Sequence, residues 1–374
     1  MPVKPFKLRC RHCNQPVSWP PQQPRCPRPV CRGPLQPKRN IVFDASLIEL
    51  SLPGMWRYRH LLPPVHDNPV SLGEGGTPLL RLSHSGKGIV YVKNETLNPT
   101  GSFKDRGAAF LINTIQGDDK MVIDDSSGNA GAALAAYAAR AGMRVRIFVP
   151  AAAPEGKTRQ ILRFGAELEA VSGGRDAVAE AADAFAQNPD VFYASHVWHP
   201  GYSLAMQTIA WEIWEQLGRR APEWVILPAG NGTLLRGVRW GFRSLQKAKY
   251  IQDLPRLVAV QAQACAPLLA RSRDAYRPGR FTASPTIADG VAIPNPPHID
   301  AMWAAVRKTK GRVIAIPEAE IVQAQAELAR QGFCVEPTAA LPYAALAHME
   351  DALAPNDAVA LILTGHGFKA ERSL

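Results

Sequence analysis

One lysine of the sequence, Lys104, stands where an amine can act as a nucleophile. It follows a turn of Asn, Pro, Thr, Gly and Ser at residues 98–102 and opens a predicted helix over residues 103–115. We expect the hydroxyl of Ser102 to cap this helix by accepting an N–H of the first turn. A protonated lysine is a poor nucleophile, but desolvation or a nearby cation lets the amine form a Schiff base. Most lysines are simply solvated, so the interpretation depends on the rest of the chain.

Two turns that contain glycine can bind anions. Residues 126–129 (Ser-Ser-Gly-Asn) precede an alanine-rich helix that ends near Gly142, and residues 228–232 (Pro-Ala-Gly-Asn-Gly) follow a predicted strand and open a helix. The N–H groups at such a helix N-terminus converge on an anion, and the helix dipole favours its charge. The second turn is neither a Walker A motif nor GxGxxG. Alone, the first turn is more typical of a capped helix in any α/β protein.

Metal chemistry is indicated by four of the six cysteines, which lie in residues 1–40: Cys10, Cys13, Cys26 and Cys31. They form a C-x2-C pair and a C-x4-C pair separated by twelve residues, and four thiolates suit tetrahedral zinc. The second pair is wider than usual, and Pro27 and Pro29 stiffen it. His12 is a candidate substitute ligand. The hypothesis is a structural zinc ribbon, and the alternative is a degenerate ribbon with free thiols. Without metal, ten prolines in 40 residues leave little core, so we expect poor order.

The elements that must position these residues alternate between short apolar strands and helices. Strands are predicted over residues 89–93, 121–124, 144–149, 167–171, 224–227, 257–261, 312–316 and 359–363. Helices are predicted over residues 103–115, 129–142, 155–164, 176–186 and 318–331, and a long helix within 193–217. This alternation predicts an α/β fold with parallel sheets covered by helices on both faces. The expected organisation is a ribbon-like segment, 1–40, and a catalytic domain, 41–374, with two lobes around one cofactor cleft.

Charge and composition exclude several classes of protein. The formal net charge is +11, but residues 1–40 hold nine of the 43 Lys and Arg residues and no acidic residue, so the rest of the chain is close to neutral. A nucleic-acid-binding protein with a vestigial enzyme fold is therefore a remote alternative. No apolar run is long enough for a membrane span, and no secretory signal is visible at the N-terminus, so we expect a cytoplasmic protein without disulfides.

The segment NPTGSFKDRG, residues 98–107, resembles the cofactor-lysine motif of threonine synthase and its relatives, the fold-type-II enzymes that use pyridoxal 5′-phosphate (PLP). The segments WRYRHLLP and GEGGTPLL, the glycine turns, TGHGFK near the C-terminus and the N-terminal cysteine ribbon are similar to the same family. The resemblance spans nearly the whole chain. It implies a tryptophan synthase β-like fold of two lobes with parallel and mixed sheets.

The resemblance also implies a role for individual residues. Lys104 would carry PLP through a Schiff base, Asn129 would bind the 3-hydroxyl of its ring, and Thr364 would face the ring nitrogen. The substrate carboxylate would be held by Ser127 and by the N–H groups of Asn129 and Ala130. The phosphate of PLP would be held by the second glycine turn, at Gly230, Asn231, Gly232, Thr233 and Leu234.

The implied reaction is a carbon–oxygen lyase reaction that converts O-phospho-L-homoserine and water to L-threonine and phosphate. Lys93, Lys157 and Arg163 are candidate contributors to a basic cleft for the substrate phosphate. One departure stands at residues 292–296 (Ala-Ile-Pro-Asn-Pro), where threonine synthases usually carry a basic residue before Gly-Asn-Pro. This departure leaves open a serine/threonine dehydratase or a β-replacement synthase that takes an O-phosphoserine-type substrate.

Two expectations concern partners and the remaining histidines. The expected partner is a small amino-acid substrate, phosphorylated if the resemblance to threonine synthase holds, and a homodimer is the default for the family. His196 and His199 suggest a metal site, but no third ligand stands beside them in the sequence. We therefore expect packing or hydrogen-bonding roles for both histidines.

Overall fold

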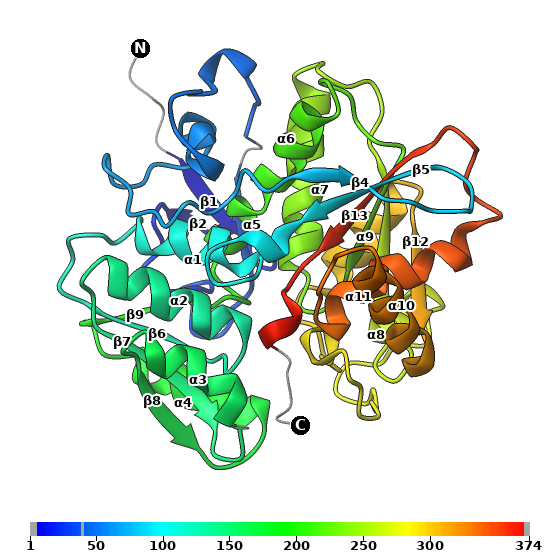
Figure 1. Cartoon of the computed structure of the whole chain (residues 1–374). Helices are drawn as coiled ribbons and strands as arrows, with labels where there is room; N and C mark the ends of the chain where they lie inside the picture. The colour runs from blue at the N-terminus through cyan, green and yellow to red at the C-terminus, as the bar shows by residue number, and fades with distance from the viewer. Residues whose placement is uncertain (1–5, 39–40, 154, 370–374) are drawn as a thin grey trace. The chain divides into compact units, whose positions relative to one another are not determined.

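The computed structural model describes residues 6–38, 41–153 and 155–369, without the side chains of residues 155–157 (Figure 1). The chain forms two compact units. Unit 1 combines Met1–Gly75 with Asn98–Ala205, and unit 2 combines Gly76–Leu97 with Met206–Leu374. Each unit therefore consists of two segments that are distant in the sequence.

A four-stranded parallel sheet forms the centre of unit 1, in the order β8-β7-β6-β9. Its strands are β6 (Met121–Asp124), β7 (Val145–Pro150), β8 (Glu167–Val171) and β9 (Val191–Tyr193). The helices of the unit are α1 (Lys104–Ile112), α2 (Asn129–Arg140), α3 (Glu155–Arg163), α4 (Arg175–Phe185) and α5 (Pro200–Ala205). Helices α2 and α4 pack against β7, and α1 packs against α2 and α5 (Figure 1). Apolar residues such as Ile123 and Phe148 are buried under α4.

The N-terminal segment of unit 1 is a small antiparallel sheet in the order β2-β1-β3. Its strands are β1 (Lys7–Cys10), β2 (Pro16–Ser18) and β3 (Leu35–Pro37). Among the residues that the structure describes, its buried apolar cluster consists of Leu8, Leu35, Cys10 and Cys26, with partly buried side chains such as Val17 and Trp19 packed against it. This cluster is too small to hold a sheet of this size by apolar burial alone. This segment, residues 6–38, is called the ribbon below.

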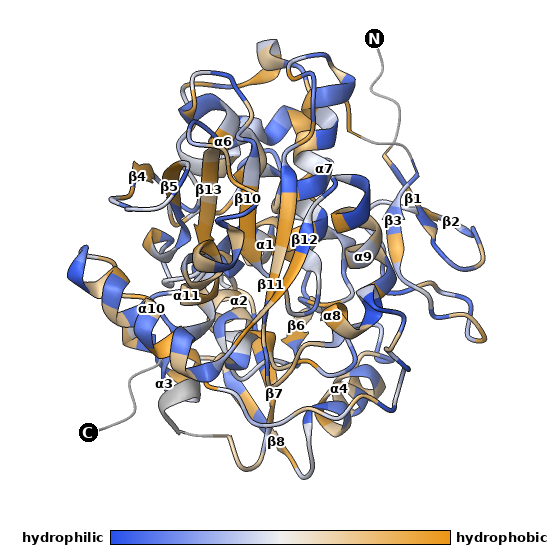
Figure 2. Ribbon diagram, turned by 90° about the vertical axis from the view of Figure 1, so that its right-hand side faces the viewer, coloured by the Kyte–Doolittle hydropathy of each residue, from blue (hydrophilic) through white to orange (hydrophobic). Residues whose placement is uncertain are grey.

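Unit 2 is built on a six-stranded sheet in the order β12-β11-β10-β13-β5-β4. Its strands are β4 (Leu79–Arg81), β5 (Ile89–Asn94), β10 (Trp224–Pro228), β11 (Arg256–Ala262), β12 (Arg312–Ile316) and β13 (Ala358–Leu363). All neighbours are parallel except β4, which pairs antiparallel with β5. The central strands are apolar along their length because both of their faces are buried (Figure 2).

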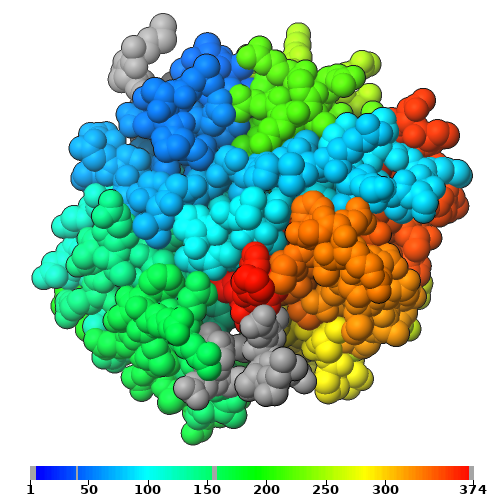
Figure 3. Space-filling view, in the orientation of Figure 1, coloured from blue at the N-terminus to red at the C-terminus, as the bar shows by residue number. Residues whose placement is uncertain are grey.

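The helices of unit 2 cover this sheet. They are α6 (Gln207–Gln216), α7 (Thr233–Lys247), α8 (Pro267–Ser272), α9 (Ile299–Lys308), α10 (Glu318–Arg330) and α11 (Pro337–Ala344). Helix α11 packs against β10, β11 and β13, while α7 and α9 pack against β11. Short 3-10 helices are η1 (Ala45–Leu47), η2 (Gly54–Leu61), η3 (Glu95–Leu97), η4 (Asp289–Val291), η5 (Ala345–Met349) and η6 (Gly367–Lys369). Figure 3 shows the C-terminal part of the chain, in red, at the surface. In η6 the side chain of Phe368 is 71% accessible.

The structure confirms the predicted α/β class and each of the eight predicted strands to within one residue or two. Gly142 has a φ of +68°, which confirms it as the residue that ends α2. The long helix predicted within residues 193–217 is present as two consecutive helices, α5 and α6, which divide at Met206. Met206 itself keeps helical backbone angles, with φ −65° and ψ −13°. Among the described residues, no helix is long and apolar enough to cross a membrane.

Candidate active site

Lys104 is the first residue of α1, and its side chain is half-buried against aromatic rings. Its Nζ lies 5.1 Å from the ring centre of Phe103 and 5.6 Å from that of Tyr202 in α5. Gly107 permits this arrangement, because a Cβ at this residue would lie 2.1 Å from Cδ1 of Tyr202. The close approach of α1 to α5 therefore fixes the amine over an aromatic face, where a cation is attracted to the ring.

The turn before Lys104 is held by a carboxylate and not by the predicted serine cap. Asp105 accepts a hydrogen bond of 2.6 Å from the backbone N–H of Thr100 and another from its hydroxyl. The prediction that Ser102 caps the helix is wrong, because α1 has no side-chain cap. The hydroxyl of Ser102 is instead fully buried and has no hydrogen-bond partner in the described chain. A buried hydroxyl in this state beside Lys104 is suited to a ligand.

The turn Ser126–Asn129 has the geometry expected for an anion-binding helix start. Asn129 is the first residue of α2, and Ser126 accepts a hydrogen bond through its Oγ from the N–H of Gly128 at 3.3 Å. A Cβ at Gly131 would lie 2.0 Å from the carbonyl oxygen of Ser126, so the turn folds directly over the first turn of the helix. Ser127 is half-buried and Ala130 is buried, and both lie in unit 1 with Lys104.

Two carboxylates and an imidazole lie together beside this turn, a cluster that the sequence did not indicate. Asp124 ends β6, Asp125 follows it, and His196 follows β9. Nδ1 of His196 is 3.0 Å from Oδ2 of Asp124, and the backbone N–H of His196 donates to Oδ1 at 3.3 Å. The hydrogen-bonding role predicted for His196 is therefore confirmed. The signal in the sequence is that these polar residues follow the carboxyl ends of two strands. Such residues come together when the two strands are neighbours in a parallel sheet.

Burial controls the protonation of this cluster. It is the main reason that the pKa of both Asp124 and Asp125 is raised to about 6, and the charge of Asp124 contributes to the shift of Asp125. Burial lowers the pKa of His196 to about 3, with a further contribution from the charge of Lys104. His196 is therefore a neutral imidazole at neutral pH. Because an ionised carboxylate only accepts hydrogen bonds, the ring carries its proton on Nδ1.

The second glycine turn lies in unit 2 between β10 and α7. Gly232 has a φ of +95°, and a Cβ there would lie 2.7 Å from the side chain of Met302. Asn231 accepts through Oδ1 from the N–H of Thr233 at 3.0 Å and from its hydroxyl at 2.9 Å. Leu234, in the first turn of α7, is buried. The turn thus presents the start of a 15-residue helix, a place where backbone N–H groups bind phosphate.

The residues that depart from the family pattern pack directly on this turn. A Cβ at Gly230 would lie 2.7 Å from the carbonyl oxygen of Gly290 and 3.4 Å from Cδ1 of Ile293. Gly290 itself donates its N–H to the hydroxyl of Thr338 at 3.1 Å. An apolar side chain, that of Ile293, therefore stands beside the turn.

Thr364 follows β13 in the same unit, and its side chain is buried. Its Oγ1 has no hydrogen-bond partner among the residues that the structure describes. A buried hydroxyl without a partner costs about 1–3 kcal/mol, which a ligand nitrogen in reach of it would recover. The orphaned hydroxyl and the glycine turn both fit the ring nitrogen and the phosphate of PLP.

The suggested basic cleft for a substrate phosphate is only partly supported. The prediction that Lys93 contributes to this cleft is wrong, because its side chain is fully buried. Its Nζ lies 2.6 Å from Oε2 of Glu212 and 3.0 Å from Oε1 of Gln216. Arg163, at the end of α3, is exposed, and the side chain of Lys157 lies outside the described residues.

The ribbon brings its four cysteines together. One Sγ–Sγ distance, between Cys10 and Cys31, is 3.6 Å, and so is that between Cys13 and Cys26. All four sulfur atoms lie within 4.8 Å of one another, and His12 is not among them. Four sulfurs at about 2.3 Å from a tetrahedral zinc ion are about 3.8 Å apart, so the set fits zinc and not disulfides. The N–H of Gln15 lowers the pKa of Cys13 to about 7, whereas burial raises that of Cys26 to about 12.

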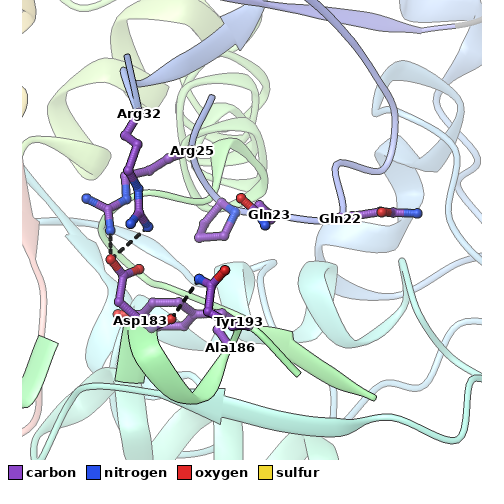
Figure 4. Close-up of a pocket in the computed structure, with 9 residues that line it drawn as sticks. Gln22, Gln23, Arg25, Arg32, Asp183, Ala186 and Tyr193 are labelled. Atoms are coloured by element: carbon purple, nitrogen blue, oxygen red, sulfur yellow. Dashed lines mark hydrogen bonds and ion pairs between the residues drawn. The ribbon is translucent and has the colours of Figure 1, made fainter. Parts of the chain in front are cut away.

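The ribbon is anchored to the rest of unit 1 by charge. Arg25 and Arg32 converge on the carboxylate of Asp183 in α4, with Nη2 of Arg32 at 2.8 Å from Oδ2 (Figure 4).

An aromatic contact also anchors the ribbon. The ring centre of Trp19 lies 5.7 Å from that of Phe110 in α1 and 6.1 Å from that of His199. Its indole N–H donates to the carbonyl of Pro64 at 2.8 Å. His199 packs against aromatic rings, which confirms the packing role predicted for it, and burial lowers its pKa to about 3.

Comparison with known proteins gives one family. The profile of the family described as pyridoxal-phosphate dependent enzyme matches residues 70–365. A threonine synthase of Methanosarcina acetivorans is 30% identical, covering 97% of this chain and 92% of its own, and one of Synechocystis sp. is 35% identical, covering 83% and 82%. Among solved structures, an O-ureido-L-serine synthase has a TM-score of 0.67 at 22% identity and covers 80% of this chain and 91% of its own. This last likeness shows the fold alone.

Proposed function

Because the chain belongs to the family of pyridoxal-phosphate-dependent enzymes, we propose that it is a threonine synthase-like lyase that converts O-phospho-L-homoserine and water to L-threonine and phosphate. The relatives' name gives the product, L-threonine, and the proposed substrate is the one that the sequence resemblance implies. The observation that carries the proposal is that the chain aligns with threonine synthases over most of its length and holds the lysine, the two glycine turns and the buried threonine hydroxyl that such an enzyme needs.

The proposed cofactor contacts are those that the resemblance to the family implies. Lys104 would hold PLP covalently, Asn129 would bind its 3-hydroxyl, and Thr364 would donate to or accept from the ring nitrogen. Its phosphate would be bound by the second glycine turn, that is by Gly230, Asn231, Gly232, Thr233 and Leu234. When bound, PLP supplies an electron sink for the bonds that break at the substrate's α and β carbons. A neutral hydroxyl such as that of Thr364 leaves the ring nitrogen less protonated than a carboxylate would, which favours elimination and replacement.

The chain's own residues supply the proton transfers and the binding of the substrate. The amine of Lys104 is proposed to take the α proton, acting as a general base. Ser127 and the N–H groups of Asn129 and Ala130 would bind the substrate carboxylate, since a helix N-terminus favours an anion. The buried hydroxyl of Ser102, next to Lys104, is a further hydrogen-bonding group for a ligand.

This proposal is tested by incubating the PLP-loaded protein with O-phospho-L-homoserine and measuring threonine and phosphate together. We expect equal amounts of both products. Lys104→Ala should abolish turnover and covalent attachment of PLP while leaving the fold intact. Normal turnover by this variant would contradict the assignment of Lys104.

A second candidate function is favoured by one observation. Ile293, and no basic side chain, stands beside Gly230 in the departing segment. This suits a serine/threonine dehydratase or a β-replacement synthase that takes an O-phosphoserine-type substrate. Release of a keto acid and ammonia from serine or threonine, without threonine formation from O-phospho-L-homoserine, would select the dehydratase.

For the ribbon we propose a structural zinc ion bound by all four of its cysteines, Cys10, Cys13, Cys26 and Cys31. Metal analysis of the purified protein should give one zinc per chain, and replacement of any one cysteine by serine should lower this content. Zinc content unchanged in all four variants would contradict the site.

The remaining proposals concern organisation. Residues 1–40 are proposed as a zinc-ribbon-like segment attached to a catalytic domain at 41–374. A cytoplasmic location and a homodimer stay predictions, and light scattering of the purified protein would decide the latter. Salt-insensitive or absent binding to DNA and RNA would remove the nucleic-acid alternative, because phosphate contacts make affinity fall steeply with salt.

A further inference from the structure

Two carboxylates and one imidazole form a buried cluster in unit 1 that the proposed reaction does not use. Asp124 is the last residue of β6, Asp125 follows it, and His196 lies three residues after the end of β9. Strands β6 and β9 are parallel neighbours, so their carboxyl ends lie at the same edge of the sheet (Figure 1). The pairing of these two strands therefore brings the imidazole to both carboxylates.

All three side chains are at least nine-tenths buried. The side chain of Asp124 is 0% exposed, that of His196 is 6% exposed and that of Asp125 is 9% exposed. Two carboxylates are costly to bury side by side, because each loses its hydration and repels the charge of the other. A cation bound between them would offset both charges at once.

The donor atoms of the cluster are spaced as the ligands of one metal ion. Nδ1 of His196 lies 3.0 Å from Oδ2 of Asp124 and 3.9 Å from Oδ1 of Asp125, and one donor atom from each residue lies within 4.8 Å of the other two. Ligands at about 2.1 Å from a metal ion are about 3.0 Å apart at a right angle and about 4.2 Å apart on opposite sides of the ion. Both distances from Nδ1 fall within this range.

One oxygen atom of the cluster has no protein partner. Oδ1 of Asp125 is buried and makes no hydrogen bond with any residue that the structure describes. This is the oxygen that lies 3.9 Å from Nδ1 of His196, so it faces the other donors of the cluster. Buried polar atoms in folded proteins almost always have a partner. A metal ion between the three side chains would be the partner of this one.

We propose that Asp124, Asp125 and His196 bind a divalent transition-metal ion of the Mn²⁺ type. Carboxylate oxygens suit Mn²⁺, imidazole suits first-row transition metals, and no thiolate among the described residues belongs to the cluster. Nδ1 binds the ion as a neutral donor, and the single proton of the ring then stands on Nε2. The other positions of an octahedral ion are taken by water.

The bound ion neutralises the two carboxylates and ties the end of β6 to the end of β9. The inference goes beyond the proposed function, because the site is made by the chain's own donors and needs neither PLP nor substrate. The competing explanation is a hydrogen-bonded cluster that shares a proton between its carboxylates and binds no metal. Titration with a metal ion separates the two explanations.

The test uses the full-length protein, loaded with PLP and dialysed to remove loosely bound metal. Mn²⁺ alone is added, and the electron paramagnetic resonance (EPR) signal of the free ion gives the amount that is bound. Mn²⁺ is a suitable probe because the thiolates of the ribbon select zinc. We expect one Mn²⁺ per chain, with nitrogen hyperfine coupling from the imidazole in the pulsed EPR spectrum of the bound ion.

Asp125→Asn is the decisive variant. It keeps the size of the side chain, and Oδ1 of Asp125 makes no hydrogen bond in the described chain, so the variant should fold. It should bind Mn²⁺ at least tenfold more weakly, because loss of even an outer partner of a metal ligand weakens binding by about 10-fold to 100-fold. His196→Leu should weaken binding as much and abolish the nitrogen coupling. Near-ultraviolet circular dichroism checks the fold of both variants.

A matched control removes an exposed carboxylate from the same unit. Asp190 lies directly before β9, and its side chain is exposed. Asp190→Asn should therefore bind Mn²⁺ as tightly as the native protein does. In the ribbon, Cys13→Ser should lower the zinc content and leave the affinity for Mn²⁺ unchanged.

Three results would overturn the inference. Failure of the native protein to bind Mn²⁺ at millimolar concentration would favour the cluster without metal. Equal affinity of the native protein and folded Asp125→Asn, or bound Mn²⁺ without nitrogen coupling, would show that the ion binds elsewhere. Because the titration uses no substrate, these failures are distinguishable from a failure of the proposed reaction.

Discussion

The buried ion pair between Lys93 and Glu212 should dominate the stability of unit 2. Nζ of Lys93 lies 2.6 Å from Oε2 of Glu212, and the two side chains are 0% and 3% exposed. Lys93 also donates to the carbonyl of Thr77 and to Gln216, while Glu212 accepts from the N–H of Gly76 at 2.9 Å. The pair therefore joins β5, α6 and the start of unit 2 in one hydrogen-bonded group.

Removing one charge leaves the other buried without the opposite charge that lies 2.6 Å away. Breaking a buried pair in this way costs about 3–5 kcal/mol, so we expect Glu212→Gln and Lys93→Met each to lower the free energy of unfolding by about 3 kcal/mol or more. This is a large share of the roughly 5–15 kcal/mol that stabilises a folded protein. The double variant Lys93→Met/Glu212→Gln should cost less than the sum of the two single variants, because it removes both charges of the pair together.

Urea unfolding of the native protein, both single variants and the double variant, followed by circular dichroism, completes the cycle. Arg312→Met is a suitable control, since Arg312 pairs with Asp351 at the surface of the same unit and such pairs contribute about 0–1 kcal/mol. Single variants of Lys93 and Glu212 that cost no more than this control would refute the reasoning. The pair would then be screened by solvent to a degree that its burial does not suggest.

Three further predictions concern other parts of the chain. Thr364→Val removes the orphaned hydroxyl but keeps the volume, so PLP should bind more weakly by about 3-fold to 30-fold in a fluorescence titration; unchanged affinity would argue against its role. Burial keeps His199 neutral, with a pKa of about 3 in the folded protein against about 6.5 in the unfolded chain. Its contribution to the free energy of unfolding is therefore complete above pH 6.5 and is lost as the pH falls. Between about pH 6 and 4, urea unfolding should show the native protein losing about 1.4 kcal/mol per pH unit more than His199→Phe. Zinc removal by a chelator should speed hydrogen exchange at Leu8 in the ribbon and spare turnover, and loss of turnover that only zinc restores would show a role beyond structure.

The fold could be predicted from the sequence because the strands of the four-stranded and six-stranded sheets are mostly short apolar runs, a pattern that depends only on local residues. The candidate site residues near Lys104 and in the two glycine turns could also be proposed from the sequence, since each stands at the junction of a turn and a helix. At such junctions the backbone conformation restricts which residue types can be used.

The Asp124–His196 pair was not visible, because 71 residues separate its members and only the pairing of β6 with β9 brings them together. The role of Lys93 was misjudged for the same reason. A lysine in a strand is normally expected to be a solvated cation. Here Glu212 in α6, which is distant in the sequence, pairs with Lys93 in the fold. The cap predicted at Ser102 failed for a different, local reason. The carboxylate of Asp105, three residues later, accepts the hydrogen bonds of the turn, and the hydroxyl of Ser102 has no partner among the described residues.

The central claim is that Lys104 is the residue that carries PLP. Reduction of the PLP-loaded protein with sodium borohydride fixes the cofactor on its lysine, and peptide mapping by mass spectrometry then identifies that lysine. We predict a single modified peptide that contains Lys104, and no modified peptide in Lys104→Ala. Modification of another lysine in the native protein, or full modification of the Lys104→Ala variant, would contradict the account.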